Sequence, residues 1–161
     1  MTSRRDAADK GWTVQAIGFV SSTRDEMVDD DWDDVPASIT LVDAFTPEAI
    51  LGLDQFSHIE VLFVFDRVAP EAVHTGARHP RGNPDWPEVG IFAQRVKNRP
   101  NRIGLSTCEV LGVGGRTIRV RGLDAIDGTP VLDIKPYMGE FGPRGDVRQP
   151  VWSHELMAGY F

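Results

Sequence analysis

The sequence predicts a mainly β protein: a single barrel or sandwich domain with one or two short helices. Short apolar segments alternate with Gly-, Pro- and Asp-rich turn signals along most of the chain. A Gly114-Gly115 step separates two of these segments, which is typical of a β-hairpin. A chain of 161 residues is long enough for one domain with its own core. We expect this domain at 12–161, after a frayed N-terminus at 1–11.

The composition is that of a globular protein in water. Hydrophobic residues make up 41% of the chain and charged residues 25%. No apolar run approaches the roughly 20 residues that span a bilayer, so no membrane partner is expected. The polar N-terminus lacks a secretory signal, and the only cysteine, Cys108, has no partner for an internal disulfide. Together these features favour the cytoplasm.

Charge is segregated along the chain. The net charge of −7 argues against a surface coated in positive charge for nucleic acid. Acidic residues concentrate at 25–34, whereas Arg and Lys concentrate at 95–121. The acidic loop could bind a cation, but we interpret it as a solvated loop. A local basic patch is still compatible with the negative net charge.

The first half should hold a strand that is buried on both faces, because residues 59–65 are almost continuously apolar. Thr46, Pro47 and Gly52 are typical of the cap, first turn and end of a short helix. Three X-Pro steps predict a long irregular loop at 68–89. The expected strands of this half are 12–20, 39–42 and 59–65.

The second half should hold the hairpin and a terminal helix. Ser153 can cap a short helix over 153–157. The apolar terminal residues are expected to pack on the barrel or across a dimer; they are Trp152, Leu156, Met157, Tyr160 and Phe161. The expected strands are one beginning at Gly90, then 106–113, 116–122 and 131–134.

A basic segment between Arg95 and Gly104 is a candidate binding loop. Pro100 keeps its neighbours extended and so fixes where Arg99 and Asn101 point. Arginine suits carboxylates and phosphates, and asparagine suits a base edge or an amide. The alternative is a solvated basic loop. We favour a binding loop because its flanks, Phe92 and Ile103, look buried and would pin it to the core.

Aspartates in the last third offer a second candidate. Asp127-Gly128 predicts a turn in which Asp127 could simply cap backbone amides. Asp133 and Lys135 alternate with apolar residues, so both charges share one side of a strand. If that side is inside, Lys135 needs Asp133 or Asp127 as a partner. A buried pair beside a cleft would mark a site, although a structural ion pair has the same sequence pattern.

Other motifs are excluded or interpreted as structural. The four histidines, His58, His74, His79 and His154, lack metal-ligand spacing, so no metal is expected. The glycines at 112–115 join two strands and open no helix, unlike a dinucleotide fingerprint. Cys108 lies in an expected strand and is interpreted as a core residue, not a nucleophile.

Three motifs in order resemble the TsaA-like (TrmO/YaeB) family. They are Leu53-x-x-Phe56-Ser57-His58 leading into Leu62-Phe63-Val64-Phe65, then Arg95-x-x-x-Arg99-Pro100-Asn101-x-Ile103-Gly104, then Asp127-Gly128-Thr129-Pro130-x-Leu132-Asp133-Ile134-Lys135-Pro136-Tyr137. The resemblance covers roughly residues 12 to 140. It implies a non-Rossmann β-barrel that binds S-adenosylmethionine, usually as a homodimer, and methylates N6 of threonylcarbamoyl-adenosine in tRNA.

The resemblance also implies residue roles. The cofactor-binding residues would be Asp66, Arg67, Arg95, Thr107, Asp124, Ala125, Ile126 and Asp127. The substrate-binding residues would be Arg99, Asn101 and Arg102. An exocyclic amine must lose a proton during or after methyl transfer, and the candidates to assist are Asp127, Asp133, Lys135 and Tyr137.

Three departures from the family bear on the acceptor more than on the cofactor. Arg102 stands where the family usually has proline, the first loop is Asp-rich instead of basic, and longer members carry a further C-terminal domain. The leading hypothesis is a methyltransferase that uses S-adenosylmethionine to modify tRNA or a smaller related acceptor. The alternatives are a non-catalytic module that binds the cofactor or a nucleotide, and a structural β-domain with paired buried charges.

Overall fold

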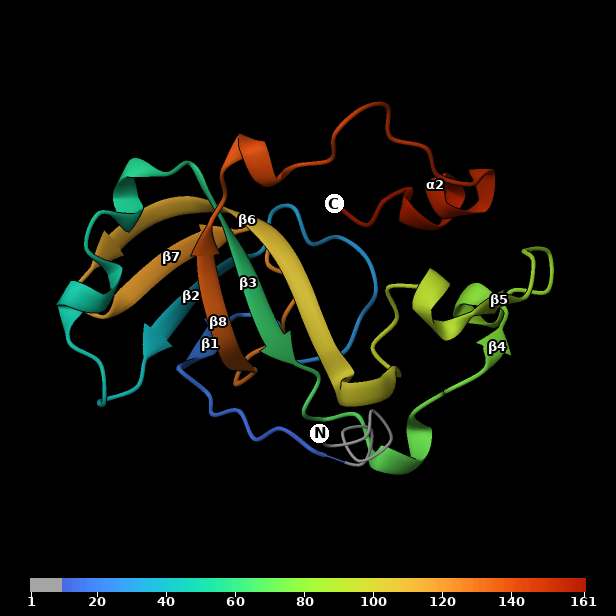
Figure 1. The fold of residues 1–161 in the computed structure, drawn as a ribbon, viewed down its shortest axis with the longest axis horizontal. Helices are drawn as coiled ribbons and strands as arrows, with labels where there is room; N and C mark the ends of the chain where they lie inside the picture. The colour runs from blue at the N-terminus through green and yellow to red at the C-terminus, as the bar shows by residue number, and fades with distance from the viewer. Residues whose placement is uncertain (1–9) are drawn as a thin grey trace, which may run out of the picture.

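A computed structural model describes residues 10–161, so most of the expected frayed N-terminus lies outside the described residues. Six strands form a closed barrel in the order β1-β2-β7-β6-β3-β8, with β8 pairing back to β1 (Figure 1). The barrel strands are β1 (Gly18–Ser22), β2 (Pro36–Leu41), β3 (His58–Val64), β6 (Ile103–Gly114), β7 (Thr117–Arg121) and β8 (Pro130–Pro136). The predicted mainly β barrel is confirmed.

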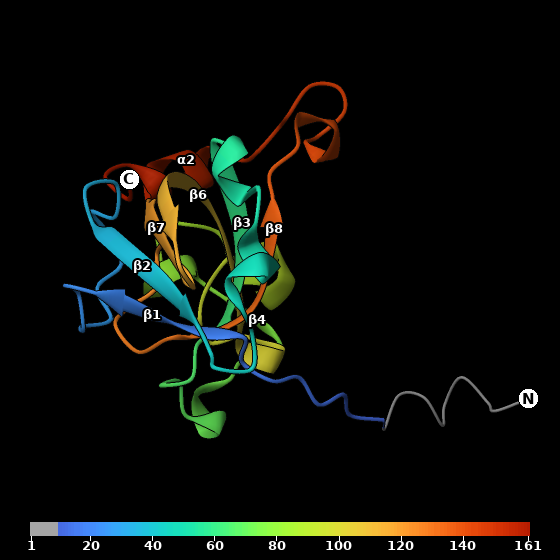
Figure 2. The ribbon, with the colours of Figure 1, turned by 90° about the vertical axis from the view of Figure 1, so that its left-hand side faces the viewer.

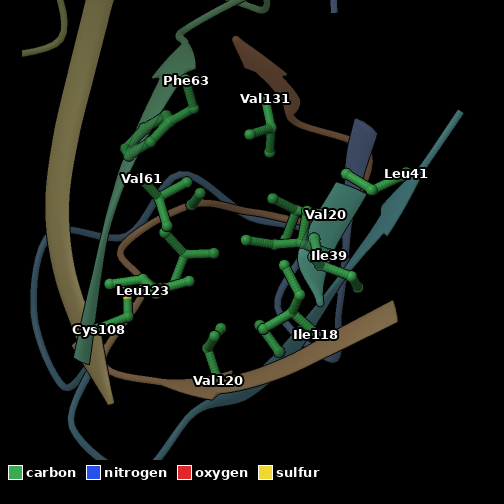
Figure 3. Close-up of a cluster of buried hydrophobic side chains, with 14 residues drawn as sticks. Val20, Ile39, Leu41, Val61, Phe63, Cys108, Ile118, Val120, Leu123 and Val131 are labelled. Carbon is green, nitrogen blue, oxygen red and sulfur yellow. The ribbon is translucent and has the colours of Figure 1, made fainter. Parts of the chain in front are cut away.

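Alternation along each strand builds the core. All barrel pairs are antiparallel, and side chains at every second position point inward. In β3, Ile59, Val61 and Phe63 are at most 1% exposed, whereas Glu60, Leu62 and Val64 are half-buried and His58 is exposed. The expectation that this strand is buried on both faces is therefore wrong for its outer face. Figure 3 shows the inward side chains, Leu123 among them, filling the barrel.

The remaining elements are short. The pair β4 (Ala77–Arg78) and β5 (Val89–Gly90) lies outside the barrel, on the same side as the helix α2 (Val151–Met157) (Figure 1). Figure 2 views the barrel from the side of β1 and β2. Single 3₁₀ turns occupy Pro47–Ile50, Leu53–Gln55, Pro70–Ala72, Pro80–Gly82, Ile91–Ala93, Pro100–Arg102 and Gly139–Phe141.

Several boundaries differ from expectation. The first strand begins only at Gly18, and the preceding Trp12 is 84% exposed. The strand expected from Gly90 becomes a 3₁₀ turn, Ile91–Ala93. The expected helix at 46–52 is also a 3₁₀ turn, and the Thr46 hydroxyl bonds to the Glu48 carboxylate instead of capping the backbone.

The terminal apolar residues pack only in part: Trp152, Leu156 and Tyr160 are half-buried, whereas Met157 and Phe161 are 37% and 56% exposed. The C-terminal helix begins at Val151, so Ser153 lies inside it and donates to the Pro150 carbonyl at 2.7 Å. Trp86 Nε1 donates to Glu155 Oε2 at 2.7 Å, which joins α2 to the loop between β4 and β5.

Two classes of feature are missing from residues 10–161. None of their helices is long and apolar enough to cross a membrane. No three His, Cys, Asp or Glu side chains in this part of the chain gather where they could hold a metal ion.

A glycine in β6 is required by the core. A Cβ at Gly104 would clash with the ring of Phe63, which is 1% exposed and has no room to turn. We expect Gly104→Ala to lower the free energy of unfolding by about 1–3 kcal/mol in urea denaturation, through overpacking. Gly114→Ala is the matched control, because its Cβ would meet nothing within 4 Å. Equal stability of the two variants would contradict this packing.

The thiol of Cys108 is a core group. It is 0% exposed, and burial, with a further contribution from the charge of Asp124, raises the pKa of Cys108 to about 12. The thiol therefore stays protonated and covered at pH values near 8. We expect the native protein to be inert to Ellman's reagent at that pH and to react at once when unfolded in guanidinium. Rapid reaction of the native protein would show that Cys108 is accessible.

Candidate functional site

The connection between β7 and β8, residues 122–129, lies among the residues expected to bind a ligand. Leu123, Ala125 and Ile126 are 0%, 3% and 9% exposed and hold the connection against the protein interior. Asp124 lies between Leu123 and Ala125, Asp127 follows Ile126, and both aspartates are only half-buried. Because an unpaired buried carboxylate is costly, both aspartates should be found in polar contacts.

The Asp124 carboxylate is held from two sides. The Ser106 hydroxyl, on β6, donates to Oδ1, and the Tyr160 hydroxyl donates to Oδ2 at 2.5 Å. Ser106 is buried and Tyr160 is half-buried. Hydrogen bonds to a carboxylate are roughly twice as strong as neutral ones, so the two donors fix how the carboxylate is oriented.

The phenol of Tyr160 is a neutral donor at any ordinary pH. Burial raises the pKa of Tyr160 far above its usual range, and the charge and hydrogen bond of Asp124 raise it further. Asp29 acts in the same direction on this pKa, while Arg95 lowers it. Both of these charges therefore lie close enough to act on the phenol. Arg95 itself donates from Nη2 to the Leu105 carbonyl at 2.5 Å.

Asp127 ties three segments together. Its Oδ1 accepts from the Ser22 amide at 3.0 Å, and its own amide donates to the Arg24 carbonyl at 2.8 Å. Its carbonyl accepts from Arg67 Nη2 at 2.9 Å, and Arg67 Nη1 donates to the Asp25 carbonyl at 2.9 Å. The amide-capping interpretation of Asp127 is confirmed, and Arg67 is brought directly against the connection. Asp66 precedes Arg67 and is exposed after the end of β3.

The acidic loop is built around a buried tryptophan. Trp32 is 3% exposed, and the Arg24 guanidinium lies 4.2 Å from the centre of its ring. Arg24 also donates to the carbonyls of Asp30 and Asp31, at 2.7 and 2.9 Å. The buried Nε1 of Trp32 has no hydrogen-bond partner among the described residues.

Two acidic side chains of this loop pair with cations of other loops. Asp30 binds Arg81 at 2.7 Å, and this hydrogen bond raises the Arg81 pKa. Asp29 lies 3.6 Å from Lys97. Apart from the buried Trp32 and the half-buried Asp30, residues 25–34 are exposed, as expected of a solvated loop. The acidic loop neutralises two cations that could otherwise face a polyanion.

The basic segment is anchored differently from expectation. Phe92 and Ile103 are 74% and 40% exposed, so they do not pin it to the core. Ile91 and Gln94 do so instead, at 2% and 8% exposure. Gln94 Nε2 bonds to the carbonyls of Arg78 and Val89, at 3.1 and 2.9 Å.

The three expected substrate-binding residues lie in this segment. Arg99 Nη1 donates to the Gln94 carbonyl at 2.8 Å, and Arg102 Nη1 donates to the Val68 carbonyl at 2.5 Å. Asn101 is exposed, with a φ of 63°, and Arg102 has a φ of 52°. Proline is fixed near −65°, so it cannot adopt the backbone conformation that Arg102 has here.

The pair of Asp133 and Lys135 lies on the outside of the barrel. The two charges are 3.1 Å apart, with side chains 49% and 61% exposed. The two charges pair as expected, but their side of the strand faces outward, so the hypothesis of a buried pair is wrong. Lys135 pairs in register with Glu60, and the Tyr137 amide donates to the His58 carbonyl, so both lie beside the beginning of β3.

Arg67 follows the opposite end of the seven-residue strand β3. At about 3.3 Å per residue, this end is roughly 13 Å from Lys135, which faces Glu60, and roughly 20 Å from Tyr137 along the strand. The structure brings Asp127 and Arg67 together but not Lys135 and Tyr137 with them.

Thr107 faces a neighbouring cleft. It points away from the core, opposite to Ser106, and lines a cleft of about 230 Å³. The cleft is also lined by Asp33, His58, Glu109, Arg121, Gly122 and Phe161. Gly122 and Phe161 lie close in sequence to Asp124 and Tyr160, so the cleft adjoins the site around Asp124.

Three residues at the site were missed as candidates: Arg24, Ser106 and Tyr160. The apolar C-terminus signalled that Tyr160 would pack, but nothing in the sequence assigns its hydroxyl to Asp124, 36 positions away. Ser106 lies in the strand predicted at 106–113, and that prediction gives no role to its hydroxyl.

The chain is similar to known proteins over most of its length. The family model of the tRNA-methyltransferase O N-terminal domain matches residues 29–142. A human tRNA (adenine(37)-N6)-methyltransferase is 40% identical over 108 residues, which are 67% of this chain and 24% of that protein. A probable S-adenosyl-L-methionine-binding protein of Methanothermobacter thermautotrophicus is 42% identical over 101 residues, 61% of this chain and 67% of that protein.

A solved structure has the same fold. The crystal structure of TrmO from Pseudomonas aeruginosa superposes with a TM-score of 0.71 at 30% identity, covering 86% of this chain and 61% of that one. The chain spans about a quarter of the length of the mammalian relatives that it matches. It belongs to the family of the tRNA-methyltransferase O N-terminal domain.

Proposed function

We propose that this protein is an S-adenosylmethionine-dependent methyltransferase that N-methylates an adenosine derivative in tRNA or a smaller related acceptor. The observation that carries the proposal is the connection between β7 and β8, in a chain of this family: it carries Asp124 and Asp127, and Arg67 donates to its Asp127 carbonyl. The relatives include proteins named as tRNA adenine-N6 methyltransferases and as S-adenosylmethionine-binding proteins. The threonylcarbamoyl form of the acceptor is the finer part of the proposal.

The chemistry of the site fits the cofactor. S-adenosylmethionine supplies an activated methyl group on a sulfonium, and it carries an amino-acid tail and an adenosine. Arg95 uses one nitrogen for Leu105. Because arginine has five N–H donors, several remain for the tail carboxylate. Asp124 offers acceptor capacity to a cation or a hydroxyl, and the buried, unpartnered Nε1 of Trp32 is a donor that a polar ligand could satisfy.

The protein's own contribution to methyl transfer is mainly positioning, because the reaction is an in-line displacement. An exocyclic amine must also lose a proton. Of the four candidates, Asp127 lies on the connection with Arg67, so we propose Asp127 first as the proton acceptor. Asp133, Lys135 and Tyr137 would need a partner subunit to bring them to the same site. We propose a homodimer, as the resemblance implies, in the cytoplasm, which the composition favours. Sedimentation of the pure protein tests the dimer.

Arg95→Ala tests the cofactor site. We expect titration calorimetry with S-adenosylmethionine to show binding by the unaltered protein and roughly 10-fold or greater weakening in Arg95→Ala, as for a lost hydrogen bond to a charged group. Arg116→Ala is the matched control, because Arg116 pairs with the exposed Asp43 instead. An unchanged Kd in Arg95→Ala would mean that Arg95 is not a cofactor ligand. Absence of binding by the unaltered protein would refute the proposed function.

The acidic loop tests whether the acceptor is a polyanion. Asp29→Asn with Asp30→Asn frees Lys97 and Arg81 from their partners. We expect this variant to bind tRNA about tenfold more tightly in low salt, with a steeper salt dependence. Asp54→Asn with Asp146→Asn is the control, since both variants change the net charge from −7 to −5 by removing two carboxylates. Equal effects of the two variants would contradict a basic tRNA surface beneath the loop.

Labelled-methyl transfer separates the enzyme from a non-catalytic cofactor-binding module. Incubation of the protein with S-adenosylmethionine labelled on its methyl group and with bulk tRNA should transfer label to the RNA. Cofactor binding without transfer to tRNA or to adenosine derivatives would favour the binding module.

A further inference from the structure

The C-terminal segment, residues 159–161, runs alongside the acidic loop. The Asp31 amide donates to the Gly159 carbonyl at 3.0 Å, and the Trp32 amide donates to the Tyr160 carbonyl at 2.9 Å. Two successive main-chain hydrogen bonds of this kind fix the direction of the segment. The Tyr160 side chain is thereby placed over the connection between β7 and β8.

The same segment is tied down at its other end by α2. Glu155 on this helix accepts the 2.7 Å hydrogen bond from Trp86. Phe161 packs its ring edge-on against Tyr160, with the ring centres 4.9 Å apart. The position of Tyr160 is therefore determined by the loop, the helix and its own neighbour, not only by the bond to Asp124.

We propose that Tyr160 is a positioning residue for the cofactor site and that it acts through Asp124. This inference rests on the proposed function. The Tyr160 hydroxyl and the Ser106 hydroxyl each take one oxygen of the carboxylate, one from the C-terminal segment and one from the barrel. A carboxylate has about four acceptor positions, so each oxygen keeps capacity for a donor of the ligand. The phenol fixes the plane in which those positions lie.

The environment suits this role. Burial and the nearby carboxylates keep the phenol protonated, so it donates at every working pH. Tyr160 is bound to the acidic loop through the main-chain hydrogen bond from Trp32, and the charges of Asp29 and Arg95 both act on its phenol. Without the phenol, Asp124 keeps only the Ser106 hydroxyl and is free to turn about its side-chain bonds.

The first test compares the variants Tyr160→Phe and Glu155→Ala in the full chain. Tyr160→Phe keeps the ring and removes only the donor. We expect its Kd for S-adenosylmethionine in titration calorimetry to rise about tenfold, with a melting temperature close to that of the unaltered protein. Glu155→Ala removes another anchor of the same tail, away from Asp124, and should leave the Kd within about twofold. An unchanged Kd in Tyr160→Phe would overturn the inference.

A double-mutant cycle shows whether Tyr160 acts through Asp124. Asp124→Asn should itself weaken binding, and adding Tyr160→Phe to it should change the Kd by less than about twofold. If Tyr160 had only a structural role, Tyr160→Phe would lower the melting temperature. It would also raise the Kd by the same factor in the unaltered protein and in Asp124→Asn. Additive losses would therefore overturn the proposed route. No binding by the unaltered protein would refute the proposed function and the inference with it, whereas binding that is indifferent to Tyr160 would refute the inference alone.

Discussion

The connection between β7 and β8 holds the candidate site together. Its apolar residues, Leu123 above all, are buried in the core and leave the connection no freedom to move away from the barrel. Its two aspartates then face outward at fixed points. Each carries hydrogen bonds from segments remote in sequence: Asp124 from β6 and the C-terminus, Asp127 from the end of β1 and from Arg67. The barrel core thus sets the geometry of a polar site that lies outside it.

Charge segregation along the sequence becomes charge pairing in the fold. The acidic loop places Asp29 and Asp30 on Lys97 and Arg81, so the acidic and basic segments meet on one side of the barrel. Exposed pairs of this kind contribute little to stability, about 0–1 kcal/mol each. Their larger consequence is for recognition, because the loop occupies cations that would otherwise attract phosphate groups. An RNA acceptor would have to displace this loop or use other cations, whereas a small acceptor would not.

The sequence predicts those parts of the fold that neighbouring residues determine. Alternation and the Gly114-Gly115 step were enough for a mainly β domain, because both are local features, whereas the choice of a barrel over a sandwich came from the family resemblance. Alternation also placed Asp133 and Lys135 on one face of a strand but left open whether that face lies inside or outside the barrel. In β8, Val131 pairs with Phe63 and Asp133 pairs with Leu62, so Leu132 is an extra residue that shifts the register. A bulge of this kind has no signature that the sequence pattern alone could expose.

The site residues divide in the same way. Arg67, Arg95 and the segment 124–127 were named because contiguous motifs resemble a family. The Tyr160 hydroxyl was missed because its bond to Asp124 spans 36 positions and depends on how the tail lies against residues 31–32. The buried flanks of the basic segment were misassigned because Phe92 and Ile91 are adjacent, and only the 3₁₀ turn decides which of them faces inward.

Hydrogen–deuterium exchange of the full chain, with and without saturating S-adenosylmethionine, tests directly whether these remote segments form one cofactor site. Protection should appear together at 24–34, 66–67, 122–129 and 159–161, because each is bonded to another member of the set. Protection confined to the outer face of β8 around Asp133 and Lys135, or none at 122–129, would contradict a site organised by Asp124 and Asp127.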